Sequence, residues 1–148
     1  MKATFKNIIT DFENFCDNHN QINEFTWGPL TNISTKEQDF ILVHCLPAPS
    51  QYIGREVILS FEVLILDIVK QDKTNFKDVM NDNLLIGLDI VANFFDDEDT
   101  YDWTLDEDSV LIRPFFEEFD DYCAGYVFEI NISIENRLNT CDIPENLT

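Results

Sequence analysis

The stretch Arg55–Val69, which reads REVILSFEVLILDIV, decides the fold class of this chain because its apolar residues recur at every second position. The other face of the stretch is mixed and includes Ser60 and Glu62. This period of two predicts a strand that lies with one face on a hydrophobic core. The residues of the apolar face are Val57, Leu59, Phe61, Val63 and Ile65.

A second stretch, Cys123–Asn136, reads CAGYVFEINISIEN and alternates in the same way. Both stretches are longer than a typical strand of about 5–6 residues. A small domain does not need strands of that length. We therefore expect part of each stretch to bend, twist or project toward another surface.

Two amphipathic helices are predicted from apolar residues that recur three and four positions apart. The first covers Thr4–His19. The second begins at a cap formed by Thr74 or Asn75 and runs to about Phe95. It contains Gly87, which costs about 1 kcal/mol relative to alanine. A close approach by a strand is one reason for a glycine at that place.

Shorter segments complete the predicted fold. A strand over Asp39–Leu46 ends at Pro47, since proline cannot continue a ladder, and residues 50–54 turn the chain back. A strand over Ser109–Phe116 contains Pro114 and is therefore placed at a sheet edge. Residues 25–29 combine two aromatic side chains with a glycine and a proline, and this combination predicts a turn.

The resulting order is helix, strand, strand, helix, strand, strand. It predicts an α+β fold in which two long hairpins form an antiparallel sheet or partial barrel, with the two helices on one side. The chain has 148 residues, which suits one domain over residues 1–148. Residues 137–148, which include Pro144, predict a flexible tail.

The charge of the chain excludes several classes of function. It has 29 acidic residues against nine lysines and arginines, and its net charge is -20. Binding to DNA or RNA needs a basic face, and anionic lipids repel such a chain, so we expect neither kind of binding. An acidic surface around a channel would let DNA pass without sticking. No signal peptide or spanning segment is recognisable, so we expect a cytoplasmic site of synthesis.

Acidic residues concentrate between residues 96 and 108. Like charges at this density repel each other, so we expect the segment to be exposed toward a channel or a partner. Trp103 and Leu105 within it need an apolar surface, on this chain or on a neighbour. The segment lacks the glycine and the spacing of a calcium loop, so no metal site is predicted. The candidate channel-facing or partner-facing residues are Asp96, Asp97, Glu98, Asp99, Asp102, Asp106, Glu107 and Asp108.

No catalytic motif is recognisable in the sequence. His44 and Cys45 are adjacent in a predicted strand, so their side chains point to opposite faces. The four cysteines form no C-x-x-C pair and are interpreted as free structural thiols. We therefore predict no catalytic residue, no metal and no cofactor. The candidate subunit-interface residues are Trp103, Glu62, Leu64, Leu66, Val127 and Glu129.

Two segments resemble a known family. Phe25-Thr-Trp-Gly-Pro-Leu30, followed by Asp39-Phe-Ile-Leu-Val-His44, is similar to the opening of small neck proteins from tailed phages. Glu62-Val-Leu-Ile-Leu-Asp67, then Asp72-Lys-Thr-Asn75 and the following helix, resembles the same group, and the closest similarity is to neck proteins of crAss-like phages. The resemblance covers about residues 21–95.

The resemblance implies a head-to-tail connector of the tail-completion or tail-terminator type. Such a protein forms a homo-oligomeric ring of about six or twelve copies in the virion and surrounds a DNA channel. Its partners are other neck, portal or tail proteins. The composition leaves a second interpretation open, an acidic DNA-mimic inhibitor that binds a basic host protein. Nothing in the sequence favours an enzyme.

Overall fold

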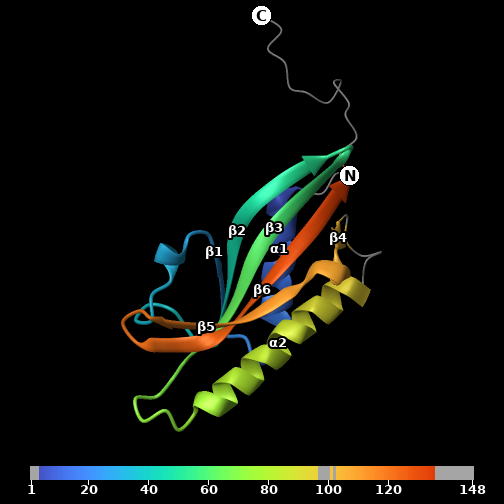
Figure 1. The fold of residues 1–148 in the computed structure, drawn as a ribbon. Helices are drawn as coiled ribbons and strands as arrows, with labels where there is room; N and C mark the ends of the chain where they lie inside the picture. Colours follow the sequence, from blue (N-terminus) through green and yellow to red (C-terminus); the bar gives the residue numbers. More distant parts are fainter. Residues whose placement is uncertain (1–3, 97–100, 102, 136–148) are drawn as a thin grey trace, which may run out of the picture.

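The computed structural model describes residues 4–96, 101 and 103–135, and it shows an α+β fold (Figure 1). Its elements are α1 (Phe5–Asn18), β1 (Glu24–Trp27), η1 (Leu30–Asn32), β2 (Leu42–Ile53), β3 (Glu56–Ile68), α2 (Phe76–Asp96), β4 (Thr104–Leu105), η2 (Glu107–Ser109), β5 (Leu111–Glu118) and β6 (Tyr122–Glu135). The sheet is mixed and curls into a half-barrel. Its strand order is β1-β2-β3-β6-β4, and β5 also pairs with β6.

The two long strands form the centre of the sheet. β3 and β6 are antiparallel neighbours from the pair Glu56–Glu135 to the pair Ile68–Cys123. Their bounds agree closely with the two alternating stretches, which confirms both strand predictions. Figure 1 shows β2, β3 and β6 running together past the end of α2, so one end of the sheet projects beyond that helix.

The main core lies between one face of the sheet and the two helices, as the alternating stretches predict. Ile8 and Phe12 of α1 and Ile86 and Phe94 of α2 belong to this core. Both helices occupy the predicted ranges. Thr4 caps α1, because its side chain accepts a hydrogen bond from a backbone N–H of the first turn.

Gly87 lies where α2 crosses β6. A Cβ atom at this position would overlap the ring of Phe128, which is buried on β6. The missing side chain therefore allows the helix to approach the strand closely. This contact confirms the reason that the sequence suggested for a glycine within the helix.

Of the predicted antiparallel sheet or partial barrel from two hairpins, the curl is confirmed and the antiparallel two-hairpin arrangement is not, because the sheet is mixed. Residues that predicted an aromatic turn form β1 instead, and β1 runs parallel to β2 from the pair Glu24–Leu42 to the pair Trp27–Cys45. The turn follows at Gly28, whose φ of 112° suits glycine. The short strand β4 adds a further pairing with β6. The sheet is therefore not built from two hairpins alone.

The prediction that Pro47 ends a strand was also wrong. β2 continues through Pro47 and Pro49 to its end, and its register against β3 shifts between Ala48 and Gln51. β1 covers only the first part of β2. Proline lacks a backbone N–H and is tolerated at a strand edge that pairs with no neighbouring strand. The outer edge of β2 meets that condition over its second half.

The predicted tail, residues 137–148, lies outside the described residues. In the segments that the structure describes, no helix has both the length and the apolar character needed to cross a membrane.

Candidate functional site

The predicted acidic site is only partly described by the structure. Asp96 is the last residue of α2, and Glu107 belongs to the short helix η2. Asp106 and Asp108 are exposed at that turn. The residues outside the described ranges are Asp97, Glu98, Asp99 and Asp102.

Asp106 organises the acidic turn. Its carboxylate accepts hydrogen bonds from the backbone N–H of Asp108 at 3.1 Å and from Ser109 Oγ at 2.9 Å. Asn131 Nδ2 of β6 donates to Ser109 Oγ at 2.9 Å, and Ser60 Oγ of β3 donates to Asn131 Oδ1 at 2.6 Å. This chain of hydrogen bonds connects the turn to two central strands, so it fixes Asp106 beside the sheet.

Asp106 also borders a hollow of about 420 Å³ near the projecting end of the sheet. Apolar side chains of Ile58 and Phe95 line it together with the acids Glu56 and Asp106 and the hydroxyl of Ser133. Its volume lies in the range of ligand pockets. A lining of this kind suits an occupant that combines an apolar body with a positive charge.

Trp103 does not lie on the surface, so its prediction as a subunit-interface residue was wrong. Its side chain is 3% exposed and packs against the rings of Phe12 and Phe94, with ring centroids 6.2 Å and 5.0 Å away. Its indole Nε1 donates a hydrogen bond to Asp11 Oδ2 at 2.9 Å. The apolar surface that Trp103 needs is therefore supplied by α1 and α2 of the same chain.

Leu64, Leu66 and Val127 are also buried within the chain, which corrects their assignment to a subunit interface. They form a second core with Leu42 and Ile33 on the sheet face opposite the helices. The β1–β2 connection and the curl of β5 and β6 cover this face. The side chains that close it are Phe40, Leu46, Phe115 and Phe119.

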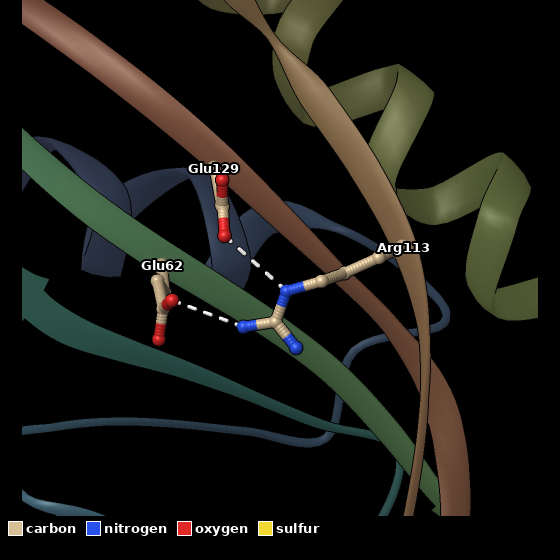
Figure 2. A network of polar contacts seen from close by, with 3 residues as sticks. All are labelled: Glu62, Arg113 and Glu129. Atoms are coloured by element: carbon tan, nitrogen blue, oxygen red, sulfur yellow. Dashed lines mark hydrogen bonds and ion pairs between the residues drawn. The ribbon is translucent and has the colours of Figure 1, made fainter.

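The last two predicted interface residues, Glu62 and Glu129, face each other across the β3–β6 ladder and both bind Arg113 of β5 (Figure 2). Arg113 Nη2 donates to Glu62 Oε1 at 3.0 Å, and Nε donates to Glu129 Oε1 at 3.2 Å. Sequence reasoning missed Arg113. A signal was present, because Arg113 is the only lysine or arginine between Lys77 and Arg137.

The Arg113 cluster joins three strands, and its arginine stays charged. Partial burial acts to lower the pKa of Arg113, but the hydrogen bonds and charges of Glu129 and Glu62 outweigh it and raise that pKa. An arginine that stays charged neither donates nor accepts a proton in catalysis. The geometry instead holds β5 to β3 across β6 and supports the curl of the sheet.

His44 is fully buried and is held at both ring nitrogens. Nε2 lies 2.7 Å from the carbonyl oxygen of Gly28, and Nδ1 lies 2.7 Å from Thr26 Oγ1. The carbonyl can only accept, so Nε2 carries the proton and the Thr26 hydroxyl donates to Nδ1. Burial lowers the pKa of His44, which favours the neutral ring. Cys45 lies in the main core on the other face, so these neighbours form no dyad.

Three of the cysteines are buried free thiols, namely Cys16, Cys45 and Cys123. Burial raises the pKa of Cys16 and of Cys123 to about 12, which keeps both thiols protonated and unreactive. Within residues 4–96, 101 and 103–135, no three histidine, cysteine or acidic side chains are grouped as metal ligands. Cys141 lies outside the described residues.

No protein-family model and no curated protein matches this chain.

Proposed function

We propose that this protein is a virion structural protein, a ring-forming neck component that joins the portal complex to the tail around the DNA channel of a tailed phage. The choice of a neck protein rests on the resemblance of residues 21–95 to neck proteins of crAss-like phages. The assembling role rests on one structural observation. The projecting β2–β3 end exposes Tyr52 by 53% and Ile53 by 56%.

Exposed apolar side chains at a projecting end support a packing role. Such groups cost free energy in water, and neighbouring molecules commonly cover them. This chain is rich in charged residues, with a net charge of -20, and yet it places apolar residues at these exposed positions. Other large apolar side chains are exposed on α2 and β5, which adds surface for neighbours in an assembly. They are Leu85, Leu88, Phe95, Leu111, Ile112 and Phe116.

The free strand edges support contacts through side chains in place of strand pairing. The outer edge of β2 contains Pro47 and Pro49, and β5, which pairs with β6, contains Pro114. Proline removes a ladder donor and blunts an edge against pairing with another chain. We therefore propose that neighbouring copies meet through projecting side chains.

The acidic surface supports a channel that DNA crosses without binding. Asp108 is exposed outside the hollow that Asp106 borders, and carboxylates at a channel wall repel phosphates. The proposed ring requires no catalytic residue, cofactor or metal.

The test is the assembly state of the full chain, alone and mixed with the portal and tail proteins of the same virus. Light scattering and native mass spectrometry should find a closed ring, of about six or twelve copies. Images of intact particles should place the chain at the neck. A protein that stays monomeric with every partner and is absent from particles contradicts the proposal.

A second candidate is an acidic DNA-mimic inhibitor of a basic host protein, and one observation favours it. Exposed carboxylates also occur away from the acidic turn, at Glu13 and Asp17 of α1 and at Glu117, Glu118 and Asp120 near the β5–β6 turn. Spread acids can imitate a run of phosphates. This candidate predicts salt-sensitive binding to a basic DNA-binding protein, with duplex DNA as a competitor. A protein that competes with DNA and never assembles would favour it over the ring.

A further inference from the structure

The hollow beside Asp106 and the tip of the β2–β3 hairpin have complementary chemistry. The hollow, of about 420 Å³, offers the apolar side chains of Ile58 and Phe95 and the carboxylates of Glu56 and Asp106. Its volume and mixed lining suit a short protein segment with one cation and one or two apolar side chains. Such an occupant would bury its apolar part while its charge meets the carboxylates.

The β2–β3 tip, residues 52–55, is a segment of that kind. Tyr52 and Ile53 are 53% and 56% exposed, and Arg55 is exposed beside them. Gly54, with a φ of 60°, makes the tight turn that presents them. The tip stands at the far end of β2 and β3 in Figure 1, past the end of α2. It is therefore accessible to another molecule.

We propose that the β2–β3 tip of one copy inserts into the hollow of a neighbouring copy. Arg55 then faces Asp106, and Tyr52 and Ile53 cover the apolar lining at Phe95. This inference rests on the proposed ring, because it names the contact through which copies join. The tip and the hollow share no residue, although Glu56 of the hollow directly follows Arg55, and one tip inserted into one neighbour's hollow makes a heterologous contact that can close a ring by repetition.

Complementary charge between the exposed Arg55 and the acidic hollow supports a second copy of this chain as the occupant. Copies that each carry a net charge of -20 repel one another wherever acids meet acids. A cation placed in an acidic hollow reverses that repulsion locally and selects one orientation of approach. The nine basic residues are few, and Arg55 stands at the most projecting turn of the sheet.

The first experiment compares charge variants of the full chain under conditions in which the wild type assembles. Arg55→Asp should weaken association by about tenfold or more, since it places a third acid at the contact. Asp106→Asn should weaken it as well, and asparagine retains an acceptor for the Asp108 N–H. Lys36→Asp and Asp120→Asn are matched controls on exposed residues and should change association by less than about twofold. Sedimentation velocity measures each constant.

A charge exchange separates direct contact from a loss of folding. The double variant Arg55→Asp, Asp106→Arg should associate more tightly than either single variant, because the two charges are again opposite. Circular dichroism of each monomer checks the fold. If Asp106→Arg alone unfolds the chain, the pair Arg55→Asp and Asp106→Asn decides the matter through the comparison with the controls.

A mixed cross-link tests proximity between copies. A protein with Ile53→Cys and a protein with Thr104→Cys, which lies beside the hollow, are combined after Cys141→Ser is introduced in both. Oxidation should yield a disulfide between the two proteins, and a Lys36→Cys protein should give none with Thr104→Cys. A ring that forms normally with all charge variants and shows no cross-link overturns this contact and leaves the proposed ring intact. A chain that never assembles overturns both.

Discussion

Arg113 on β5 donates a hydrogen bond to Glu62 on β3, although β6 lies between the two strands. The same guanidinium binds Glu129 of β6, which is the residue opposite Glu62 in the ladder. Like charges directly opposite each other destabilise a sheet. Arg113 therefore offsets a repulsion between two central strands and ties the curled strand β5 to them.

Replacement of Arg113 by glutamine should lower the free energy of unfolding by about 0.5–1 kcal/mol. The effect is modest because Arg113 is 43% exposed and water screens the charges. Urea unfolding of the wild type and the variant measures it. The difference between them should shrink at about 1 M salt, where exposed charges interact little.

A second substitution shows whether repulsion is the cause. In the Arg113→Gln background, Glu62→Gln should recover most of the lost stability, because it leaves a single carboxylate at the pair. Lys36→Gln removes the same charge from an exposed loop and should change stability by less than about 0.5 kcal/mol. If the Glu62→Gln change brings no recovery, the two glutamates do not repel each other in the folded chain.

Truncation of the two tryptophans should reduce the stability of the chain by very different amounts. Trp103 is 3% exposed, whereas Trp27 is 49% exposed. Truncation of Trp103 to alanine should cost about 3–5 kcal/mol, the usual range for a buried aromatic residue. The matched change Trp27→Ala should cost far less. Urea unfolding monitored by circular dichroism compares the two losses.

Fluorescence gives an independent measurement of the same assignment. A Trp27→Phe variant keeps only Trp103, whose emission should be blue-shifted and resistant to acrylamide. A Trp103→Phe variant keeps only Trp27, which should be readily quenched. The reverse result would mean that Trp103 faces solvent or a partner, as its place in an acidic segment first suggested.

Local patterns allowed part of this fold to be predicted. The period of β3 and β6 and the spacing of α1 and α2 are carried by residues close together in the chain, so they are visible in sequence. The second core was not visible. Leu64 and Leu66 alternate with the main core, and what covers them, such as Phe40 and Phe115, comes from distant segments.

The contacts of the candidate site residues could not be predicted from the sequence for the same reason. Trp103 was assigned to a subunit interface because its neighbours in the chain are acids, but its contacts come from Phe12 and Phe94 of the same chain. Arg113 looked like one residue of an edge strand until β5, β6 and β3 were placed side by side. β1 was missed because a four-residue strand before a Gly-Pro turn has too few residues to show a period.

His44 should make stability depend on pH. Burial lowers its pKa in the folded chain below the usual value near 6.5. As the pH falls below about 6.5, His44 binds a proton in the unfolded chain but stays neutral in the folded chain. Stability therefore decreases by at most about 1.4 kcal/mol per pH unit. The contribution is complete above this range and is lost on acidification toward the folded pKa.

Urea unfolding between pH 7.5 and pH 5 measures this dependence, and NMR of the two histidine rings assigns it. Thr26 and Gly28 are the groups that hold the ring, and neither titrates. A His44→Asn variant should be less stable at pH 7.5 and should lose the step near pH 6.5. A variant that keeps the full step would assign it to another group.

Gly87→Ala should destabilise the chain even though alanine favours a helix by about 1 kcal/mol relative to glycine. The added methyl group would overlap the ring of Phe128, which is 2% exposed and enclosed by the core, so the ring cannot move aside freely. Overpacking of this kind costs about 1–3 kcal/mol and exceeds the gain in helix propensity.

An exposed position on the same helix supplies the matched control. Asn81 is exposed on α2, and Asn81→Ala should change stability little, because the gain in helix propensity offsets the loss of one exposed hydrogen bond from Asn81 Nδ2 to Asp82 Oδ1 at 3.3 Å. Restoring space by Phe128→Leu in the Gly87→Ala background should recover part of the loss, whereas Phe128→Leu alone should leave a cavity and destabilise. If Gly87→Ala is as stable as Asn81→Ala, the helix and β6 do not meet as closely as the contact with Phe128 requires.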